Sequence, residues 1–244
     1  MDLKEFAQSV IQANQEIINY LPNCQSEDYK YSNIIGEGGD NSLKMDLLFE
    51  DIFKTYLLNY ADIYSEERGH IESQNSNDFQ IILDPLDGSD NFLSHIPYFG
   101  SSIALKLQDK TIFGAVCNFS SKTIKIRYED NFYEYDLMSN QLISNPKIDN
   151  VKIGIFERSY DYPQIVQSLK DKKMKFRAYG AIALSLSYAH NVNYVLFMGD
   201  ARDFDVEAGL YLCEDLYIYK DEHFILVARK KKIFEEILAI AKQS

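Results

Sequence analysis

The 244-residue chain has no tryptophan, only three cysteines and only five prolines. The cysteines, Cys24, Cys117 and Cys213, are far apart, and no two of them have the spacing of metal ligands. An odd number of isolated thiols is typical of buried or incidental cysteines. This pattern argues against a disulfide framework, a zinc site or a redox motif.

Long apolar runs are also missing. No segment approaches the roughly 20 apolar residues that cross a bilayer, and the stretch Met1 to Phe6 shows no basic region followed by an apolar one. We therefore expect a cytoplasmic protein without a membrane partner. Hydrophobic residues make up 46% and charged residues 25% of the chain, which is typical of a globular protein.

Positive charge is scarce. Lysine and arginine number 25 against 37 acidic residues, for a formal net charge of −12. Nucleic-acid binding depends on basic side chains that neutralise phosphates, so a nucleic-acid partner is not expected. An anionic small molecule is still compatible with this charge if some carboxylates hold metal cations, whereas most of the others are expected on the solvated surface.

The first half of the chain shows helical and then strand patterns. Apolar residues at helical spacing predict helices over about 2–20 and 43–59. A short apolar strand follows at 79–83. Further strands, close enough in sequence to form an antiparallel meander, are predicted at 100–107, 111–118, 123–128 and 132–136.

The polar segment 139–150, with Asn145-Pro146, is the best candidate linker. After it, strands and helices alternate, which predicts a layered α/β arrangement. The strands are expected at 151–156, 175–178, 193–198, 216–219 and 224–228, and the helices at 161–171, 180–190, 205–213 and 231–242. We thus expect an N-terminal α+β half, 1–138, and a C-terminal α/β half, 151–244.

The most informative stretch is Asp84-Pro85-Leu86-Asp87-Gly88-Ser89. Proline fixes φ and supplies no N–H, so a rigid turn places both carboxylates and the Leu86 carbonyl at one point. Such hard oxygen ligands are what Mg²⁺ prefers. If a helix begins near Ser89, the amides of Gly88 and Ser89 form a phosphate site. The alternative is a turn with acidic helix-capping residues, although two carboxylates this close repel each other without a cation.

This stretch resembles the central motif of the inositol monophosphatase family, within the Mg²⁺-dependent, lithium-sensitive superfamily that includes fructose-1,6-bisphosphatases. Other family elements occur in the same order. They are Asp40 with Asp46, Ser65-Glu66-Glu67, the segment from Arg177 to Leu184, and Phe204-Asp205-Val206-Glu207-Ala208-Gly209. The resemblance implies an α/β (α+β) fold, a layered α-β-α-β-α sandwich of the sugar phosphatase type, and a homodimer. The C-terminal half then completes the active site.

By the same resemblance, two or three Mg²⁺ ions lie between the carboxylates and the substrate phosphate. The implied metal ligands are Glu66, Asp84, the Leu86 carbonyl, Asp87 and Asp205. Glu66 and the Ser89 hydroxyl orient the attacking water, which the metal activates, and Asp46 contacts a third ion through water. Gly88 and Ser89 bind the phosphate. The residues expected to contact substrate are Asp87, Gly180, Ala181, Arg202 and Asp205.

The chain departs from the family pattern at several positions. Leu43 replaces a threonine of the third-metal network, and Ala181 replaces a hydroxyl residue that commonly faces substrate. Glu207 replaces an alanine, and no role follows for it from sequence. Phe197 or Met198 stands where inositol-specific members carry a glutamate for ring hydroxyls, which argues against strict inositol specificity.

Arg202 has two interpretations. Its guanidinium can bind a phosphate or carboxylate of the substrate bidentately, or it can form a salt bridge with Asp200 or Asp203. His95, close to the central motif, is expected to have a surface or packing role.

The predicted function is Mg²⁺-dependent hydrolysis of a small phosphomonoester, a sugar or polyol phosphate, by metal-activated water, with inhibition by lithium. The alternatives are a phosphatase of 3′-phosphoadenosine 5′-phosphate or fructose-1,6-bisphosphate, and a non-catalytic regulatory member of the family. Leu43 and Ala181 favour the non-catalytic alternative, and the complete carboxylate set argues against it.

Overall fold

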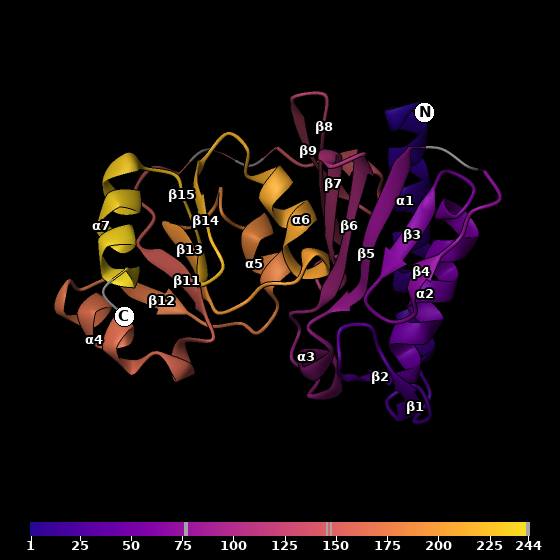
Figure 1. Ribbon diagram of the computed structural model, residues 1–244, viewed down its shortest axis with the longest axis horizontal. Helices are drawn as coiled ribbons and strands as arrows, with labels where there is room; N and C mark the ends of the chain where they lie inside the picture. Colours follow the sequence, from indigo (N-terminus) through magenta and orange to yellow (C-terminus); the bar gives the residue numbers. More distant parts are fainter. Residues whose placement is uncertain (76–77, 145, 147, 243–244) are drawn as a thin grey trace.

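The computed structural model describes residues 1–75, 78–144, 146 and 148–242, and its elements stack in five layers (Figure 1). The outer layer near the N-terminus contains α1 (Leu3–Tyr20) and α2 (Lys44–Leu57). Between the two large sheets lie α5 (Ile182–Ser187) and α6 (Asp203–Leu212), and the other outer layer holds α4 (Pro163–Asp171) and α7 (Lys231–Ala241). The expected α-β-α-β-α sandwich is confirmed.

The larger sheet has the strand order β10-β9-β8-β7-β6-β5-β3-β4. Its strands in chain order are β3 (Asp62–Ser65), β4 (Gly69–Ile71), β5 (Phe79–Asp87), β6 (Gly100–Leu107), β7 (Lys110–Asn118), β8 (Thr123–Tyr128), β9 (Asn131–Asp136) and β10 (Gln141–Leu142). The predicted antiparallel meander is confirmed in β6 to β9. Strands β3 and β5 are parallel, so their carboxyl ends meet at one edge of the sheet.

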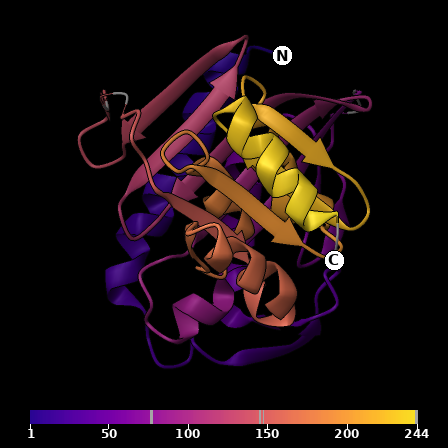
Figure 2. The same cartoon turned by 90° about the vertical axis from the view of Figure 1, so that its left-hand side faces the viewer.

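The smaller sheet has the order β12-β11-β13-β15-β14, and Figure 2 shows α7 in front of it. Its strands are β11 (Ile153–Glu157), β12 (Lys175–Arg177), β13 (Tyr194–Met198), β14 (Tyr217–Lys220) and β15 (Phe224–Ala228). β11 runs parallel to both β12 and β13, whereas β15 is antiparallel to its neighbours. The carboxyl ends of β11 and β13 therefore lie side by side.

The central strands of both sheets are buried on both faces, which explains the nearly continuous apolar sequence of β6, β7, β13 and β15 and of most of β5. On β5, Ile81 and Leu83 pack toward α1 and α2, while Ile82 packs against the middle helices. On β13, Leu196 packs toward α4 and α7, whereas Phe197 faces the middle helices. This period of two lets one helical layer, α5 and α6, complete the cores of both sheets.

Some expected boundaries were wrong. The predicted linker 139–150 contains β10, which pairs with β9 at Tyr135 and Asp136 and extends the meander, while Asn145 lies outside the described residues. The helix predicted at 180–190 is shorter, because α5 ends at Ser187. The small hairpins β1 (Tyr31–Ile35) with β2 (Asn41–Leu43), and β3 with β4, were not predicted. Strands of three to five residues carry too few positions for a reliable pattern.

The two halves share the middle layer, since α5 and α6 come from the C-terminal half and contact the larger sheet. The division at 138 and 151 stays a prediction. In the part of the chain that the structure describes, no helix is both long and apolar enough to cross a membrane.

Candidate active site and metal centre

Glu66 and Asp84 are brought together by the parallel pairing of β3 with β5. The last paired residues are Ser65 and Leu83; Glu66 directly follows the end of β3, and Asp84 is the next residue of β5. The Glu66 amide also donates to the Leu83 carbonyl at 3.0 Å. Because parallel strands end at the same edge of a sheet, two carboxylates separated by 18 positions in the sequence become neighbours.

The segment after Asp84 forms an irregularity in β5. The register with β6 shifts between Asp84 and Asp87, and Pro85 lies within this bulge, where its missing N–H removes no ladder hydrogen bond. The Leu86 amide donates to Asp84 Oδ1 at 2.9 Å, and the Leu184 amide of α5 donates to Asp87 Oδ2 at 2.8 Å. Backbone donors therefore fix both carboxylates of the motif.

Asp205 reaches the same place from the first turn of α6. One carboxylate oxygen from each of Glu66, Asp84 and Asp205 lies within 4.8 Å of the other two. We call these three residues the carboxylate cluster. Asp87 is buried beside the cluster and lines the same cavity, but it does not belong to this closest set.

Burial and mutual repulsion disfavour the ionised forms of Glu66, Asp84 and Asp87. Burial, followed by the charge of Glu66, raises the pKa of Asp84 well above its usual value. Burial also raises the pKa of Asp87, against the Leu184 hydrogen bond that lowers it. The pKa of Glu66 is raised to about 7, mainly by burial. Such a site binds either protons or cations.

Asp46, at the start of α2, is a further carboxylate that lines the same cavity. Its Oδ2 accepts from the Leu43 amide at 2.7 Å and caps the helix. Its Oδ1 is buried without a partner, and burial together with Glu67 raises the pKa of Asp46 to about 8. An unpartnered buried carboxylate oxygen facing a cavity is a position for a cation or an ordered water.

This donor set fits a hard divalent cation. Carboxylate oxygens and a backbone carbonyl are the ligands that Mg²⁺ prefers, at about 2.1 Å from the ion. Two ligands of one ion are then at most about 4.2 Å apart, so small side-chain shifts close the cluster on an ion. The unpartnered Oδ1 of Asp46 and the raised pKa of Asp84 both point to missing positive charge.

Every residue that the sequence assigned to the site lines one cavity of about 600 Å³. Gly88, directly before α3 (Ser89–Leu93), has a φ of 88°, and a side chain there would approach Ala181 Cβ and the Tyr98 carbonyl to 3.0 Å. Glycine therefore lets the motif pack closely against the start of α5. Gly180 also has a positive φ, of 78°.

The salt bridge considered for Arg202 has different partners from those expected. Neither Asp200 nor Asp203 pairs with it among the described residues. Instead, Nε donates to Asp205 Oδ2 at 2.9 Å, and Nη2 lies 2.6 Å from Glu66 Oε1. Sequence proximity suggested the wrong aspartates, since the guanidinium folds back over the first turn of α6.

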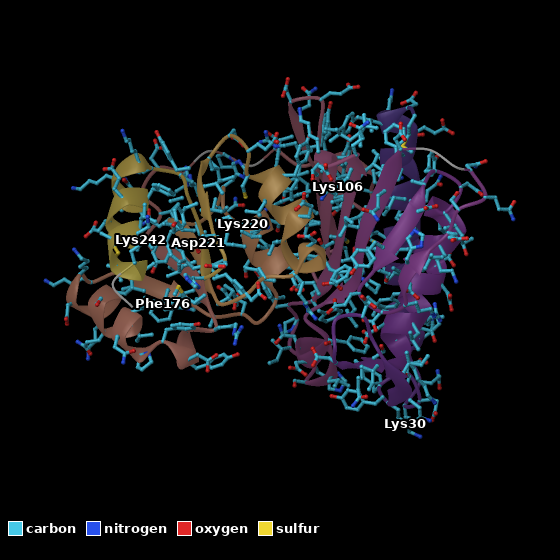
Figure 3. All side chains as sticks on the ribbon, viewed as in Figure 1. Lys30, Lys106, Phe176, Lys220, Asp221 and Lys242 are labelled. Carbon is cyan, nitrogen blue, oxygen red and sulfur yellow. The ribbon has the colours of Figure 1, made fainter. Side chains whose placement is uncertain are left out.

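Glu207 points away from the cavity. Its carboxylate accepts from the Thr111 hydroxyl of β7 and lies 3.9 Å from Lys106 Nζ on β6. Figure 3 labels Lys106 beside α6, on the larger sheet. This acidic residue therefore connects α6 to the sheet and adds no ligand to the carboxylate cluster.

Sequence reasoning missed Glu157, the last residue of β11. Its side chain is buried, and it accepts from the amides of Tyr179 and Gly180 at 3.1 and 2.9 Å and from Ser185 Oγ at 2.5 Å. Asn91 supports the same loop, because its Nδ2 donates to the Tyr179 carbonyl at 2.7 Å. The sequence feature that could have indicated this role is a glutamate as the last residue of an apolar strand.

Replacing Glu157 by glutamine is expected to loosen the loop around Gly180. The glutamine side chain keeps one acceptor oxygen, but its NH₂ group is itself a donor and faces N–H and O–H groups that need an acceptor. We expect this to cost about 1–3 kcal/mol. Urea unfolding should show this loss. Glu214→Gln, at an exposed glutamate after α6, serves as the matched control and should change the free energy of unfolding by less than about 0.5 kcal/mol. Equal stability of the two variants would contradict this role of Glu157.

Comparisons with known proteins agree with this geometry. A model of the inositol monophosphatase family matches residues 39–216. A fructose-1,6-bisphosphatase/inositol-1-monophosphatase of Methanocaldococcus jannaschii is 27% identical over 177 residues, which cover 69% of this chain and 65% of that protein. A Nus factor SuhB of Haemophilus influenzae is 41% identical over 68 residues, 27% of this chain and 25% of that protein. The chain thus spans less than two thirds of the length of these relatives.

The fold has counterparts among solved structures. The crystal structure of the extragenic suppressor protein suhB from Bartonella henselae superimposes with a TM-score of 0.78 at 20% identity and covers 99% of both chains. The family match extends from before the Asp84–Ser89 motif to beyond Asp205, and so includes every residue of the carboxylate cluster. The chain belongs to the inositol monophosphatase family.

Proposed function

We propose that this chain is a Mg²⁺-dependent phosphatase of small phosphomonoesters. The observation that carries the proposal is the carboxylate cluster on the wall of a 600 Å³ cavity. A cavity lined by so many carboxylates repels an anionic substrate unless cations are bound. Bound cations would turn the same residues into a phosphate site, and several relatives of this chain are named phosphatases.

The proposed ligands follow the pattern of the family. Glu66, Asp84 and the Leu86 carbonyl would hold one ion, and Asp84, Asp87 and Asp205 a second one. Asp46, with its unpartnered Oδ1, would contact a third ion through water. When bound, Mg²⁺ would supply Lewis-acid chemistry, lowering the pKa of a water molecule and offsetting charge on the phosphate.

The remaining roles belong to residues around the motif. Glu66 and the Ser89 hydroxyl would orient the attacking water, and the amides of Gly88 and Ser89 would hold non-bridging phosphate oxygens. Asp87 is held in place by the Leu184 amide, which ties the motif to the start of α5. Positioning of this kind is the main contribution of a protein to phosphoryl transfer.

The leaving alcohol would contact Gly180, Ala181 and the end of β13. Phe197 lines the cavity there with 7% of its surface exposed. It provides no acceptor for a ring hydroxyl, so a strict preference for myo-inositol phosphate is not expected.

The proposal is tested by measuring phosphate release from a panel of sugar, polyol and nucleotide phosphates. We expect release that requires Mg²⁺, stops on adding EDTA and resumes when Mg²⁺ is restored. Release that is independent of divalent cations, or absent for the entire panel, would reject it. Inhibition by Li⁺, a cytoplasmic location and a homodimer stay predictions.

A second candidate, a phosphatase acting on substrates with two anionic groups, is favoured by Arg158. This residue lines the cavity, and its own ion pair is with the exposed Asp161 at 3.5 Å. Its backbone is left-handed, with φ 57°, and its guanidinium lies against Gly199, where a side chain would approach Nη1 to 2.7 Å. It can therefore receive a second phosphate, as fructose-1,6-bisphosphate or 3′-phosphoadenosine 5′-phosphate would require.

Arg158→Gln should then lower kcat/KM for a bisphosphate by roughly 10- to 100-fold, because a hydrogen bond to a charged group contributes about 1.5–3 kcal/mol. The value for a monophosphate of the same sugar should change by less than about threefold. Arg158→Lys keeps the charge but loses the planar fork, so its kcat/KM for the bisphosphate should lie between the values of the native chain and of Arg158→Gln. An equal effect on both substrates would argue against a second-anion contact.

The non-catalytic alternative is favoured by one comparison, since a relative that matches part of this chain is named a Nus factor. The side chain of Leu43 is buried in the core and supplies no hydroxyl, but the neighbouring Ser42 lines the cavity. Binding of Mg²⁺ without phosphate release from any substrate would favour this alternative.

A further inference from the structure

Arg202 forms ionic contacts with two residues of the carboxylate cluster, Asp205 and Glu66. Nε and Nη2 donate to the two oxygens of Asp205 at 2.9 and 3.0 Å, and Nη2 lies 2.6 Å from Glu66 Oε1. Two of the three cluster carboxylates therefore share one guanidinium. A bidentate pair of this kind is among the stronger ionic contacts in proteins.

The same side chain also reaches the β1–β2 hairpin. Nη1 donates to the Gly38 carbonyl at 2.8 Å. A side chain at Gly38 would collide with this guanidinium and with Glu66, so glycine permits the close approach. Arg202 thus connects three segments: the hairpin, the turn after β3, and the first turn of α6.

The position of Arg202 in the chain explains this geometry. It lies three residues before Asp205 and directly precedes α6, so its side chain folds back over the first turn of the helix. Its amide also donates to Asp205 Oδ2, at 3.3 Å. The hydrogen bond to Asp205, the largest contribution, raises the pKa of Arg202, which therefore carries its full charge at every physiological pH.

We propose that Arg202 is a built-in counter-cation that competes with the divalent metal for Glu66 and Asp205. The inference rests on the metal site of the proposed function and adds to it a residue that sets metal affinity. An ion coordinated by Glu66, and a second one coordinated by Asp205, would replace the guanidinium at those oxygens, because a carboxylate oxygen cannot serve both at full strength. Release of Arg202 also breaks its contact with Gly38, so metal binding and the hairpin are coupled.

The test is calorimetric titration of the purified chain with Mg²⁺, comparing the native protein with Arg202→Gln. We expect the variant to bind Mg²⁺ with a roughly tenfold lower dissociation constant, equivalent to about 1.4 kcal/mol. Arg202→Lys, which keeps one charge but not the bidentate fork, should be intermediate. Arg229→Gln is the matched control, since Arg229 follows β15 and donates to the Ile148 carbonyl. It should bind Mg²⁺ like the native chain.

Thermal melts give a second readout. In EDTA, Arg202→Gln should melt below the native chain, because the cluster loses its counter-charge, and saturating Mg²⁺ should remove the difference. Unchanged or weaker Mg²⁺ binding in Arg202→Gln overturns this inference and leaves the proposed function intact. If neither chain binds Mg²⁺, the proposed metal site fails as well.

Hydrogen exchange tests the link to the hairpin. Backbone amides of residues 36–40 should exchange faster when Mg²⁺ is added to the native chain. In Arg202→Gln they should already exchange at the faster rate in EDTA. Exchange in this segment that is equal in both chains and insensitive to Mg²⁺ would overturn the coupling.

Discussion

Asp84→Asn is expected to abolish Mg²⁺-dependent phosphate release, lowering kcat/KM by roughly 10³-fold or more. Metal ions contribute several kcal/mol to such transition states, and each 1.36 kcal/mol is a factor of ten in rate. Asparagine keeps an acceptor for the Leu86 amide, so the turn itself should persist. The measurement is steady-state phosphate release at saturating Mg²⁺.

Although it abolishes activity, the same substitution should stabilise the folded chain in EDTA. Burial beside Glu66 raises the pKa of Asp84, which means that its ionised form destabilises the folded chain at neutral pH. A neutral amide removes this repulsion, so the melting temperature in EDTA should rise, while the further increase caused by Mg²⁺ should disappear. Asp109→Asn, at an exposed turn residue between β6 and β7, controls for the chemical change. An active Asp84→Asn chain would contradict the account.

The second large effect concerns pH. In EDTA, the free energy of unfolding should fall as the pH rises from about 5.5 to 8.5, by on the order of a few kcal/mol. The pKa values of Asp46 and Glu66 are raised to about 8 and about 7 in the folded chain. Across this window the folded chain keeps protons that the unfolded chain has released, so a higher pH favours unfolding. Urea unfolding at several pH values measures the slope.

Two comparisons isolate this effect. Saturating Mg²⁺ should flatten the slope, because cations replace the protons on the same carboxylates. Asp46→Asn should also flatten it, since it removes the group with the pKa of about 8. A free energy of unfolding that rises across this window in EDTA, or a slope unaffected by Asp46→Asn, would show that these carboxyls are not held as described.

Sequence and structure agree best where chemistry is local. The Asp84–Ser89 motif predicts its own turn because proline, glycine and a helix start lie within six positions. The short, continuous apolar runs in β5 and β13 likewise predict strands. These features depend on residues that are close together in the chain, so they can be predicted from one sequence.

The rest depends on long-range pairing. Glu66 approaches Asp84 only because β3 runs parallel to β5, and a three-residue hairpin partner such as β4 leaves almost no pattern. Glu157 holds the loop at Gly180, which lies between β12 and α5 and is distant from Glu157 in the sequence. The partners of Arg202 depend on how the side chain folds back over α6. Resemblance to the family supplied Glu66, and it supplied neither Glu157 nor the contacts of Arg202.

The central claim is that the carboxylate cluster binds divalent cations next to a phosphate site. The most direct measurement is anomalous diffraction from crystals grown with Mn²⁺ and inorganic phosphate. We expect anomalous peaks in contact with Glu66, Asp84 and Asp205, and a phosphate against the amides of Gly88 and Ser89. A map with Mn²⁺ bound elsewhere and no peak at the cluster would contradict it.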